Sequence, residues 1–365
     1  MDPTNDSLIL CFATQGEGHI EDERILALLE PLRPQPYAFD RSSKLRSALG
    51  LVKAARAQRP DLIVMEGTGT GGGLTLIAID ALMGIPYVVS SGDAVGPYLG
   101  LHSRLVGILG SLYERLLCRR CAGFVGWTPY LVGRALTFGA PRGMTAPGWT
   151  RSHAPEGARE RVREQLGITG EPLVVGLVGT LHWNDTVGYA YGAELISAIR
   201  RVQRRDVVVC IVGDGDGRGR LQEMAGEDLG SRVLLPGRVP AAEVPDYLAA
   251  FDVGSLSQSV DGVGSFRYTT KLSEYLASEL PVITGEIPAA YDLDDGYMWR
   301  LPGAAPWSPV YISALAELLE RLSPQEVAER RTAILHRRDE PFDSAAQQRR
   351  MTGFIQDILA GRRSE

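Results

Sequence analysis

The chain has 365 residues, of which 44% are hydrophobic and 22% are charged, and its formal net charge at pH 7 is −6. This length is enough for two domains with separate cores. The acidic balance argues against a nucleic-acid-binding protein, which needs a basic face to follow phosphates. No apolar run reaches the roughly 18–20 residues of a membrane span. The first residues lack the basic region and cleavage site of a signal peptide, so we expect a cytoplasmic protein.

The first half of the chain alternates short β-rich runs with helical segments. We expect helices over 21–32 and 42–59, and strands over 8–14, 36–40, 61–66, 86–91 and 123–128. This alternation is typical of a parallel sheet covered on both faces. The segment 146–158 then contains Pro and Gly without periodicity, so we interpret it as a linker.

The alternation begins again after the linker. Strands are expected over 172–180, 206–214, 232–238, 252–259 and 281–286. The sequence therefore predicts an α/β protein with two Rossmann-like domains, 1–150 and 151–342. An amphipathic helix over 343–362 is expected to pack back on the first domain. Ligands of such sheets bind beyond the carboxyl ends of the strands, so we expect a site in a cleft where those ends face each other.

The four cysteines are Cys11, Cys118, Cys121 and Cys210. Cys118 and Cys121 form an isolated C-x-x-C motif. A structural zinc site needs two more ligands nearby, and the sequence offers none. We expect reduced thiols instead.

The segment YTTKLSEYLASELPVITGE, residues 268–286, places several polar groups at the start of a helix. Thr269 or Thr270 can cap this helix, and Lys271 and Glu274 share one of its faces. The helix N-terminus and the Lys ammonium suit a diphosphate, and a carboxylate suits a ribose diol. The pattern predicts a nucleoside diphosphate site. The alternative is a capped helix with a surface Lys–Glu pair.

Part of the same segment, KLSEYLASELPVITGE, resembles the K-x-x-E-Y-L-A-x-x-x-P-V-I segment of GT-B glycosyltransferases, especially of the family 4 type. Upstream, VVCIVGDGDGRGRLQ resembles that family's strand and turn ending in G-x-G. The run VLLPGRVPAAEVPDYLAAFDVGSLSQS resembles its V-x-x-x-G-x-V, acidic-residue and A-D-V run. The resemblance covers about 173–284. It implies a GT-B fold, with two Rossmann-like domains facing across a cleft, the acceptor on 1–150 and a nucleotide-sugar donor on 151–342.

The resemblance also implies roles for single residues. Glu274 would bind ribose, Lys271 with Thr270 would bind phosphate, and the backbone around Arg238 and Val239 would hold the base of a UDP-type donor. The expected donor-binding residues here are Arg238, Val239, Tyr268, Thr269, Thr270, Lys271 and Glu274.

Two positions depart from the family pattern. Family members often carry Arg and Lys where this chain has LHWND, and we expect His182 and Asn184 to replace them in donor binding. The family's second acidic residue falls at Phe266. Ser265, in the segment DGVGSFR, is then expected near the sugar or the phosphate.

The loop ATQGEGHIEDER follows the first strand. Gly16 and Gly18 allow backbone N–H groups to approach the donor. His19 stands at the helix entrance, and the loop resembles the G-G-H loop of inverting GT-B enzymes. His19 is therefore a candidate catalytic residue. The alternative is a tight turn with a capping His.

The loop MEGTGTGGGLTL imitates a dinucleotide fingerprint. Gly67, Gly69 and Gly72 fit G-x-G-x-x-G, with Asp93 about twenty residues further on. However, that fingerprint belongs to the first strand of its unit, whereas this loop follows about the third. We expect instead a loop that opens close to the acceptor, with Glu66 and Asp93 at strand ends and Asp93 as a catalytic candidate.

Two further segments allow more than one interpretation. The DGD at 214–216 imitates a metal-binding D-x-D, but a GT-B fold places it in a turn, so we expect no essential metal. The segment 103–120 is amphipathic with a basic edge. A core-packing helix is the plainer explanation, and peripheral contact with an anionic membrane at the inner membrane surface is the alternative.

The sequence thus predicts a hexosyltransferase that uses a nucleotide-diphosphate sugar without metal or other cofactor. Retention is favoured, although His19 would suit inversion. The acceptor is left open among a glycan, a lipid-linked glycan and a small molecule. The alternatives are a GT-B-fold nucleotide-sugar epimerase and a non-catalytic nucleotide-sugar-binding subunit.

Overall fold

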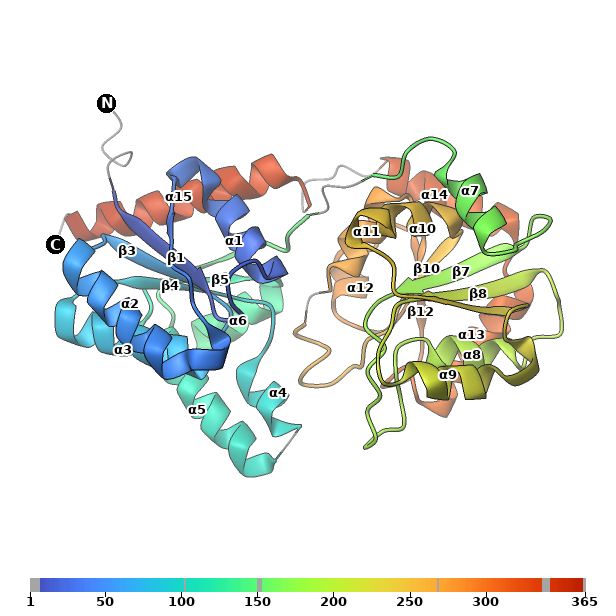
Figure 1. Ribbon diagram of the computed structural model, residues 1–365, viewed down its shortest axis with the longest axis horizontal. Helices are drawn as coiled ribbons and strands as arrows, with labels where there is room; N and C mark the ends of the chain where they lie inside the picture. The colour runs from blue at the N-terminus through green and yellow to red at the C-terminus, as the bar shows by residue number, and fades with distance from the viewer. Residues whose placement is uncertain (1–6, 102, 150–152, 268, 337–341, 364–365) are drawn as a thin grey trace. The chain divides into compact units, whose positions relative to one another are not determined.

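The computed structural model describes residues 7–101, 103–149, 153–267, 269–336 and 342–363. These residues form two compact units (Figure 1). Unit 1 contains the chain up to Trp149, the C-terminal helix, and also Phe266 and Arg267. Unit 2 contains the remaining described residues. Within the described residues, no helix is both long and apolar enough to cross a bilayer.

Unit 1 is built on a six-stranded parallel sheet with the order β2-β1-β3-β4-β5-β6. All residues of β1, β3, β4 and β5 are buried, as expected when helices cover both faces. The strands are β1 (Ile9–Ala13), β2 (Gln35–Pro36), β3 (Leu62–Glu66), β4 (Tyr87–Ser91), β5 (Gly123–Gly126) and β6 (Gly143–Thr145).

Alternate residues of β1 enter different cores because successive side chains of a strand point to opposite faces. Ile9 and Cys11 pack under α1 (Ile20–Leu29) and α15 (Ser344–Arg363). Leu10 and Phe12 pack on the other face. That face carries α2 (Lys44–Gln58), α3 (Thr70–Met83), α5 (Arg104–Arg120) and α6 (Pro129–Thr137) (Figure 1). The remaining short elements are η1 (Glu30–Leu32), η2 (Arg41–Ser43) and α4 (Val95–Gly100).

The C-terminal helix α15 lies beside α1 (Figure 1). The side-chain amide of Gln348 donates to the Ala27 carbonyl at 2.7 Å. The buried Gln347 exchanges two hydrogen bonds with the backbone of Gly148. The apolar face of α15 is therefore covered by unit 1.

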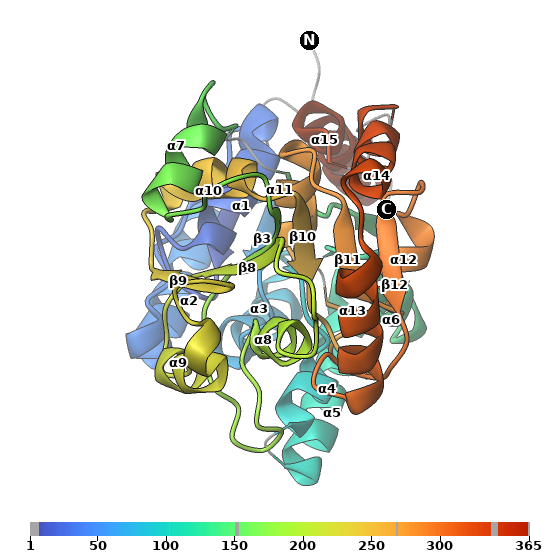
Figure 2. The same cartoon turned by 90° about the vertical axis from the view of Figure 1, so that its right-hand side faces the viewer.

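Unit 2 is a second six-stranded parallel sheet, with the order β12-β11-β10-β7-β8-β9. Its strands are β7 (Leu173–Val178), β8 (Val207–Val212), β9 (Val233–Gly237), β10 (Val253–Leu256), β11 (Val282–Gly285) and β12 (Met298–Leu301). One face carries α8 (Ala193–Ile199), α9 (Arg218–Ala225) and α13 (Pro309–Arg321) (Figure 2). The other carries α7 (Ala158–Gln165), α10 (Val244–Ala250) and α11 (Lys271–Ala277) (Figure 1). The remaining elements are η3 (Gly226–Asp228), η4 (Ala241–Glu243), α12 (Ala289–Asp292) and α14 (Pro324–His336).

The predicted fold class, α/β with two Rossmann-like domains, is confirmed by these two sheets. The expected strand over 36–40 is wrong in position, because β2 ends at Pro36 and Asp40 caps η2 by accepting from the Ser42 N–H. The sequence also missed β6 and β12. Both are short edge strands that pair on one side only, so their sequences lack a continuous apolar run.

Candidate functional site

Unit 2 has a pocket of about 790 Å³ at the carboxyl ends of β7, β8 and β9. Strand order reverses between β7 and β10, the kind of position at which parallel sheets bind ligands. We call this the unit 2 pocket. It is lined by 178–180, His182, 212–215, Arg238, Val239 and Val244.

Glycines allow the turns of this pocket to meet backbone to backbone. Gly213 has φ +148°, and a Cβ at this position would lie 1.8 Å from the carbonyl oxygen of Gly179. Any side chain there would force the two turns apart. The turns after β7 and β8 therefore offer mainly backbone to a ligand.

Lys271 begins α11, and its side chain lies beside Gly179 of the pocket wall, although Lys271 is not itself among the lining residues. A Cβ on Gly179 would lie 3.2 Å from Lys271 Cε and 3.4 Å from Nζ. The Nζ atom also lies 4.9 Å from the centroid of the Tyr191 ring. The structure thus brings the ammonium predicted for a phosphate next to a glycine that lines the unit 2 pocket.

Glu274 is half-buried on the next turn of α11. Burial raises the pKa of its carboxyl, and the Lys271 charge and a hydrogen bond with Thr270 partly oppose the shift. The hydroxyl oxygen of Thr269 accepts a hydrogen bond from the backbone N–H of Lys271 at 3.4 Å. Tyr268, expected to bind the donor, lies outside the described residues. The remaining polar groups of the 268–286 segment, Thr269, Thr270, Lys271 and Glu274, gather at the start of α11.

The residues that replace the family's Arg and Lys are placed differently from each other. His182 is exposed and lines the unit 2 pocket. Asn184 does not line it, and its side-chain oxygen accepts from the Thr186 N–H at 3.0 Å within a turn. Ser265 is half-buried in another turn and does not line it either.

Phe266 and Arg267 belong to unit 1 instead of the donor domain in which the sequence placed them. The ring of Phe266 packs on the hydrophobic core of unit 1, and its carbonyl accepts from the Thr128 hydroxyl at 2.9 Å. Arg267 Nε lies 3.4 Å from Asp93 Oδ1. The position of the family's second acidic residue therefore serves unit 1 in this chain.

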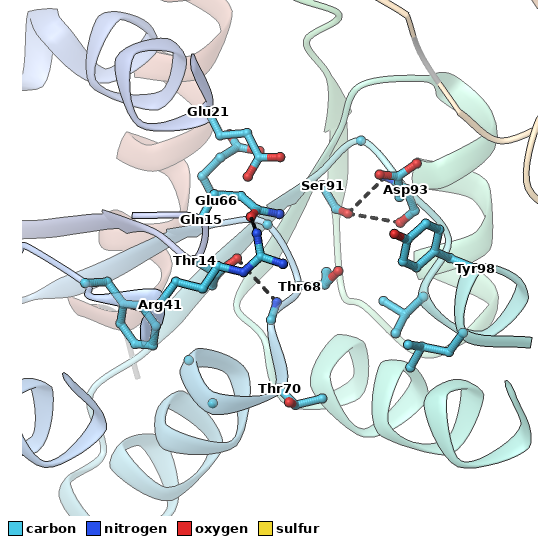
Figure 3. Close-up of a pocket in the computed structure, with 18 of the residues that line it drawn as sticks. Thr14, Gln15, Glu21, Arg41, Glu66, Thr68, Thr70, Ser91, Asp93 and Tyr98 are labelled. Carbon is cyan, nitrogen blue, oxygen red and sulfur yellow. Dashed lines mark hydrogen bonds between the residues drawn. The ribbon is translucent and has the colours of Figure 1, made fainter. Parts of the chain in front are cut away.

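Unit 1 has its own pocket, of about 400 Å³, at the carboxyl ends of β1, β3 and β4 (Figure 3). We call it the unit 1 pocket. Strand order reverses between β1 and β3, so this pocket too lies at a reversal point. Its charged lining residues are Glu21, Arg41, Lys44, Glu66, Asp93 and Arg267.

Asp93 and Glu66 both line the unit 1 pocket, but only Asp93 has a carboxylate oxygen without a hydrogen bond. Asp93 Oδ1 is buried and makes no hydrogen bond within the described residues, although Arg267 is close by. Glu66 is fully buried, pairs with Arg24 at 2.5 Å and accepts from the Trp127 indole N–H at 3.0 Å. Glu66 is therefore part of the internal framework.

Glu21 is a residue of the unit 1 pocket that the sequence reasoning missed. Its Oε2 atom is buried and has no hydrogen-bond partner within the described residues. Burial and the negative charges of Glu66 and Asp93 raise its pKa to about 7, against the opposing charges of Arg24 and Arg41. The sequence offers only the pattern of three acids in the first turn of α1, which is ordinary for a helix start.

His19 caps α1, which agrees with the alternative expected from the sequence, a tight turn with a capping His. Its Nδ1 accepts from the Glu21 N–H at 3.4 Å, and the residue is exposed and does not line the unit 1 pocket. Gly16 and Gly18 have φ of +113° and +73° and form the turn before it. Neither glycine lines the unit 1 or the unit 2 pocket.

The glycine-rich loop after β3 lines the unit 1 pocket over residues 67–72, and its glycines also allow close helix packing. A Cβ on Gly72 would lie 3.0 Å from the Phe12 ring and 3.1 Å from the Met65 sulfur, and one on Gly73 would collide with the Tyr113 hydroxyl. These glycines let α3 pack closely on the sheet. The loop follows the third strand in sequence order, as expected.

The D-x-D and C-x-x-C motifs, which resemble metal-binding motifs in sequence, consist of residues that make local contacts or are buried. Asp214 accepts from the N–H of Gly215 at 2.9 Å. Cys118 and Cys121 are buried free thiols, and burial raises the pKa of both. Among the described residues, no group of three or more His, Cys, Asp or Glu side chains is arranged to hold a metal ion.

Comparison with known proteins adds family information to this geometry. Residues 172–321 match the family model "Glycosyl transferases group 1", and residues 6–147 match "Glycosyl transferase 4-like domain". HepE from Anabaena, solved with UDP, is 16% identical with a TM-score of 0.73, over 96% of this chain and 100% of that chain. Sucrose-phosphate synthase from Thermosynechococcus elongatus is 12% identical with a TM-score of 0.69, over 97% and 100%. No curated protein sequence matches the chain.

Proposed function

Because the chain belongs to the family 4-like glycosyltransferases of the GT-B fold, we propose that it transfers a hexose from a UDP-type sugar to an acceptor hydroxyl, with retention and without a metal ion. Lys271 beside the unit 2 pocket carries this proposal. An ammonium at the edge of a pocket built from glycine turns suits a diphosphate that must approach the backbone closely.

The donor residues follow from that anchor. The diphosphate lies against Lys271 and Thr270, the base against the backbone of Arg238 and Val239, and the ribose hydroxyls on Glu274. The Anabaena protein HepE has also been solved with UDP-glucose, at 15% identity and a TM-score of 0.72. That complex supports the choice of a UDP-type donor.

The chemistry needs a positive charge beside the leaving diphosphate more than it needs a protein base. As the bond between the sugar C1 and the diphosphate oxygen breaks, Lys271 stabilises the charge that develops on the diphosphate. The acceptor oxygen bonds to C1 on the same face, and its proton passes to the leaving phosphate. His19 fits this route as a hydrogen-bond donor to a ligand. Its Nδ1 accepts from the Glu21 N–H, so the proton of the neutral ring is on Nε2.

The acceptor is assigned to the unit 1 pocket. Asp93 supports this assignment, since its buried Oδ1 is paired with Arg267 at 3.4 Å but accepts no hydrogen bond, and a ligand hydroxyl would supply that donor. The proposal predicts that Asp93→Asn raises the acceptor KM while leaving the donor Kd unchanged.

A donor panel tests the function directly. The purified protein is incubated with UDP-glucose, UDP-galactose and UDP-N-acetylglucosamine, with and without a mixture of sugars and glycosides. Transfer, or slow hydrolysis of the donor, supports the proposal, and NMR of the product's anomeric proton reads retention or inversion. Formation of an epimeric nucleotide sugar would identify an epimerase, and binding without turnover would identify a non-catalytic subunit.

The exposed face of α5 supports the proposal that the protein contacts an anionic membrane surface. It packs through Gly107, Gly110, Leu117 and Cys118, so the core-packing expectation holds for one face only. The opposite face exposes a row of apolar side chains, and exposed arginines flank it, a combination typical of interfacial helices. The apolar residues are Leu105, Ile108, Leu109, Leu112 and Leu116, and the exposed arginines are Arg104, Arg115, Arg119 and Arg120.

Vesicle sedimentation tests the membrane contact. The wild type is expected to sediment with phosphatidylglycerol vesicles and to stay in the supernatant with phosphatidylcholine vesicles. A double change, Leu109→Glu with Leu112→Glu, should abolish sedimentation, whereas Leu82→Glu, at an even more exposed position on α3, should not. Dimerisation that is lost in the double variant, without vesicle binding, would instead make this face an interface between two copies of the chain.

A further inference from the structure

The unit 1 pocket contains two buried carboxylate oxygens that make no hydrogen bond within the described residues. They are Glu21 Oε2, from the first turn of α1, and Asp93 Oδ1, from the loop after β4. Both side chains reach into the same hollow (Figure 3). A buried acceptor without a donor destabilises the folded protein. Arg267 Nε forms an ion pair with Asp93 Oδ1 at 3.4 Å without a hydrogen bond, so the need for a donor is greatest at Glu21, and a ligand in the pocket would supply hydrogen bonds to both oxygens.

The cations around the pocket do not fill this role for Glu21. Arg24 donates to Glu66, to Ser90 and to the backbone. Arg41 donates to the side chain of Gln15 at 2.5 Å. Glu21 Oε2 instead lies close to the loop after β3, because a Cβ on Gly67 would be 3.3 Å from it. The glycine thus leaves room for the carboxylate at the pocket wall.

The charges of the wall also limit what the ligand can be. Ionised carboxylates only accept hydrogen bonds, so the ligand must donate them. An ammonium group would donate too, but the three cations of the lining, Arg41, Lys44 and Arg267, balance its three carboxylates, so the pocket has no net negative charge to favour a cation. Neutral hydroxyl groups donate without needing such a charge. A molecule with a single hydroxyl would satisfy one of the two oxygens and leave the other unpaired.

We propose that Glu21 is an acceptor-recognition residue, and that it and Asp93 each accept a hydrogen bond from a hydroxyl of a polyhydroxylated acceptor, a sugar or a polyol. This inference rests on the proposed glycosyl transfer and adds the class of acceptor and the residue that selects it. The raised pKa of Glu21, about 7, has a consequence for pH. The charged form that accepts most strongly becomes dominant only above neutrality, so the acceptor KM should fall as the pH rises through about 7.

The test compares Glu21→Gln with Glu23→Gln, which changes an exposed acid on the same helix. Acceptors are D-glucose, its monodeoxy derivatives, myo-inositol and glycerol, set against cyclohexanol and N-acetylserine amide as acceptors with one hydroxyl. We expect the wild type to prefer the polyhydroxylated acceptors. Glu21→Gln should raise the KM of the best acceptor about tenfold, the worth of one hydrogen bond to a charged group, with kcat nearly unchanged. Glu23→Gln should change neither constant.

Two further measurements test the role of Glu21 independently of the steady-state rates at one pH. Calorimetry of acceptor binding should show the same loss of affinity in Glu21→Gln, and the acceptor KM of that variant should no longer depend on pH near 7. One monodeoxy acceptor should bind the wild type and Glu21→Gln equally, because it lacks the hydroxyl that Glu21 accepts.

Three results would overturn the inference. They are an unchanged acceptor KM in Glu21→Gln, a preference of the wild type for acceptors with one hydroxyl, and a loss confined to kcat, which would make Glu21 a proton acceptor. Hydrolysis of the nucleotide sugar without acceptor separates this failure from failure of the proposed function. Hydrolysis that persists in both proteins leaves glycosyl transfer intact, whereas a wild type that neither hydrolyses nor transfers any donor contradicts the proposed function itself.

Discussion

Asp216 Oδ1 accepts a hydrogen bond from the backbone N–H of Trp183 at 2.8 Å, which ties the turn after β8 to the loop after β7. This bond and the neighbouring His182 hold the pKa of Asp216 below its usual range. The carboxylate is thus engaged in loop structure. We expect transfer to continue unchanged in EDTA, and Asp216→Asn, which keeps the accepting oxygen, to retain activity. Transfer that stops in EDTA and returns with Mn²⁺ or Mg²⁺ would make Asp214 and Asp216 ligands.

Lys271 is predicted to stabilise the leaving diphosphate. Lys271→Met keeps most of the apolar stem and removes the charge, so kcat should fall on the order of 10²–10³-fold, as when one preorganised electrostatic group is lost. Gly179→Ala should have a smaller effect of the same kind, because its new Cβ would crowd Lys271 Nζ. Lys53→Met, at an exposed position of α2, is the control. Steady-state rates with saturating donor decide, and an unchanged kcat in a folded Lys271→Met would remove this role.

Glu274 is predicted to bind the donor's ribose. Removing its carboxylate in Glu274→Ala should weaken donor binding by about 1.5–3 kcal/mol, the worth of a hydrogen bond to a charged group. Glu317→Ala changes an exposed acid in the same unit and should leave affinity unchanged. Calorimetry with the donor measures both. An unchanged donor affinity in a folded Glu274→Ala variant would remove Glu274 from the donor site.

Much of the fold could be predicted because local pattern and tertiary structure agree. The buried runs of β1, β3, β7 and β8 are continuous apolar strands, and each was placed within a residue or two of its observed bounds. The family resemblance came mainly from about 173–284, in unit 2, where the spacing around Lys271 and Glu274 is regular. The strands that were missed, β6 and β12, owe their form to a neighbouring strand rather than to their own sequence.

The candidate site could be predicted only where its residues are near in sequence. Glu21 could not be found, because its burial and its raised pKa depend on Glu66 and Asp93, which are distant along the chain. The same holds for Phe266, whose ring packs on the core of unit 1 although the chain before it, up to Ser265, belongs to unit 2. Long-range packing of this kind leaves no local pattern to read.

Glu21 also makes a prediction about stability with an opposite sign to its effect on acceptor binding. Its folded pKa, about 7, exceeds the ordinary value of 4.5, so its favourable contribution is present below pH 4.5 and is lost as the pH rises through 7. Glu21→Gln removes the buried charge. Allowing for partial exposure, we expect a gain of about 1 kcal/mol, or about 2–4 °C in Tm, at pH 8.

The control is the same comparison at pH 4.5, where the wild-type carboxyl is already protonated and no gain in Tm is expected. Glu23→Gln should show no gain at either pH. A Glu21→Gln variant that melts lower than the wild type at pH 8 would mean that the carboxylate has a partner within the fold and is not held open for a ligand.

His19 raises a question that one substitution can answer, because capping and acid–base roles need different groups. Asn is a good N-cap, so His19→Asn keeps the cap of α1 and removes the imidazole. The Nδ1 contact with the Glu21 N–H leaves the neutral ring as a donor, and losing one donor to a ligand should lower kcat by about tenfold at most. Donor affinity should not change, since the donor is assigned to unit 2. The test is to compare the kcat of His19→Asn with that of the wild type, after confirming that the variant keeps its Tm. A loss of about 10²–10⁴-fold would instead mark His19 as the general base, and an inverted product from the wild type would agree with that reassignment.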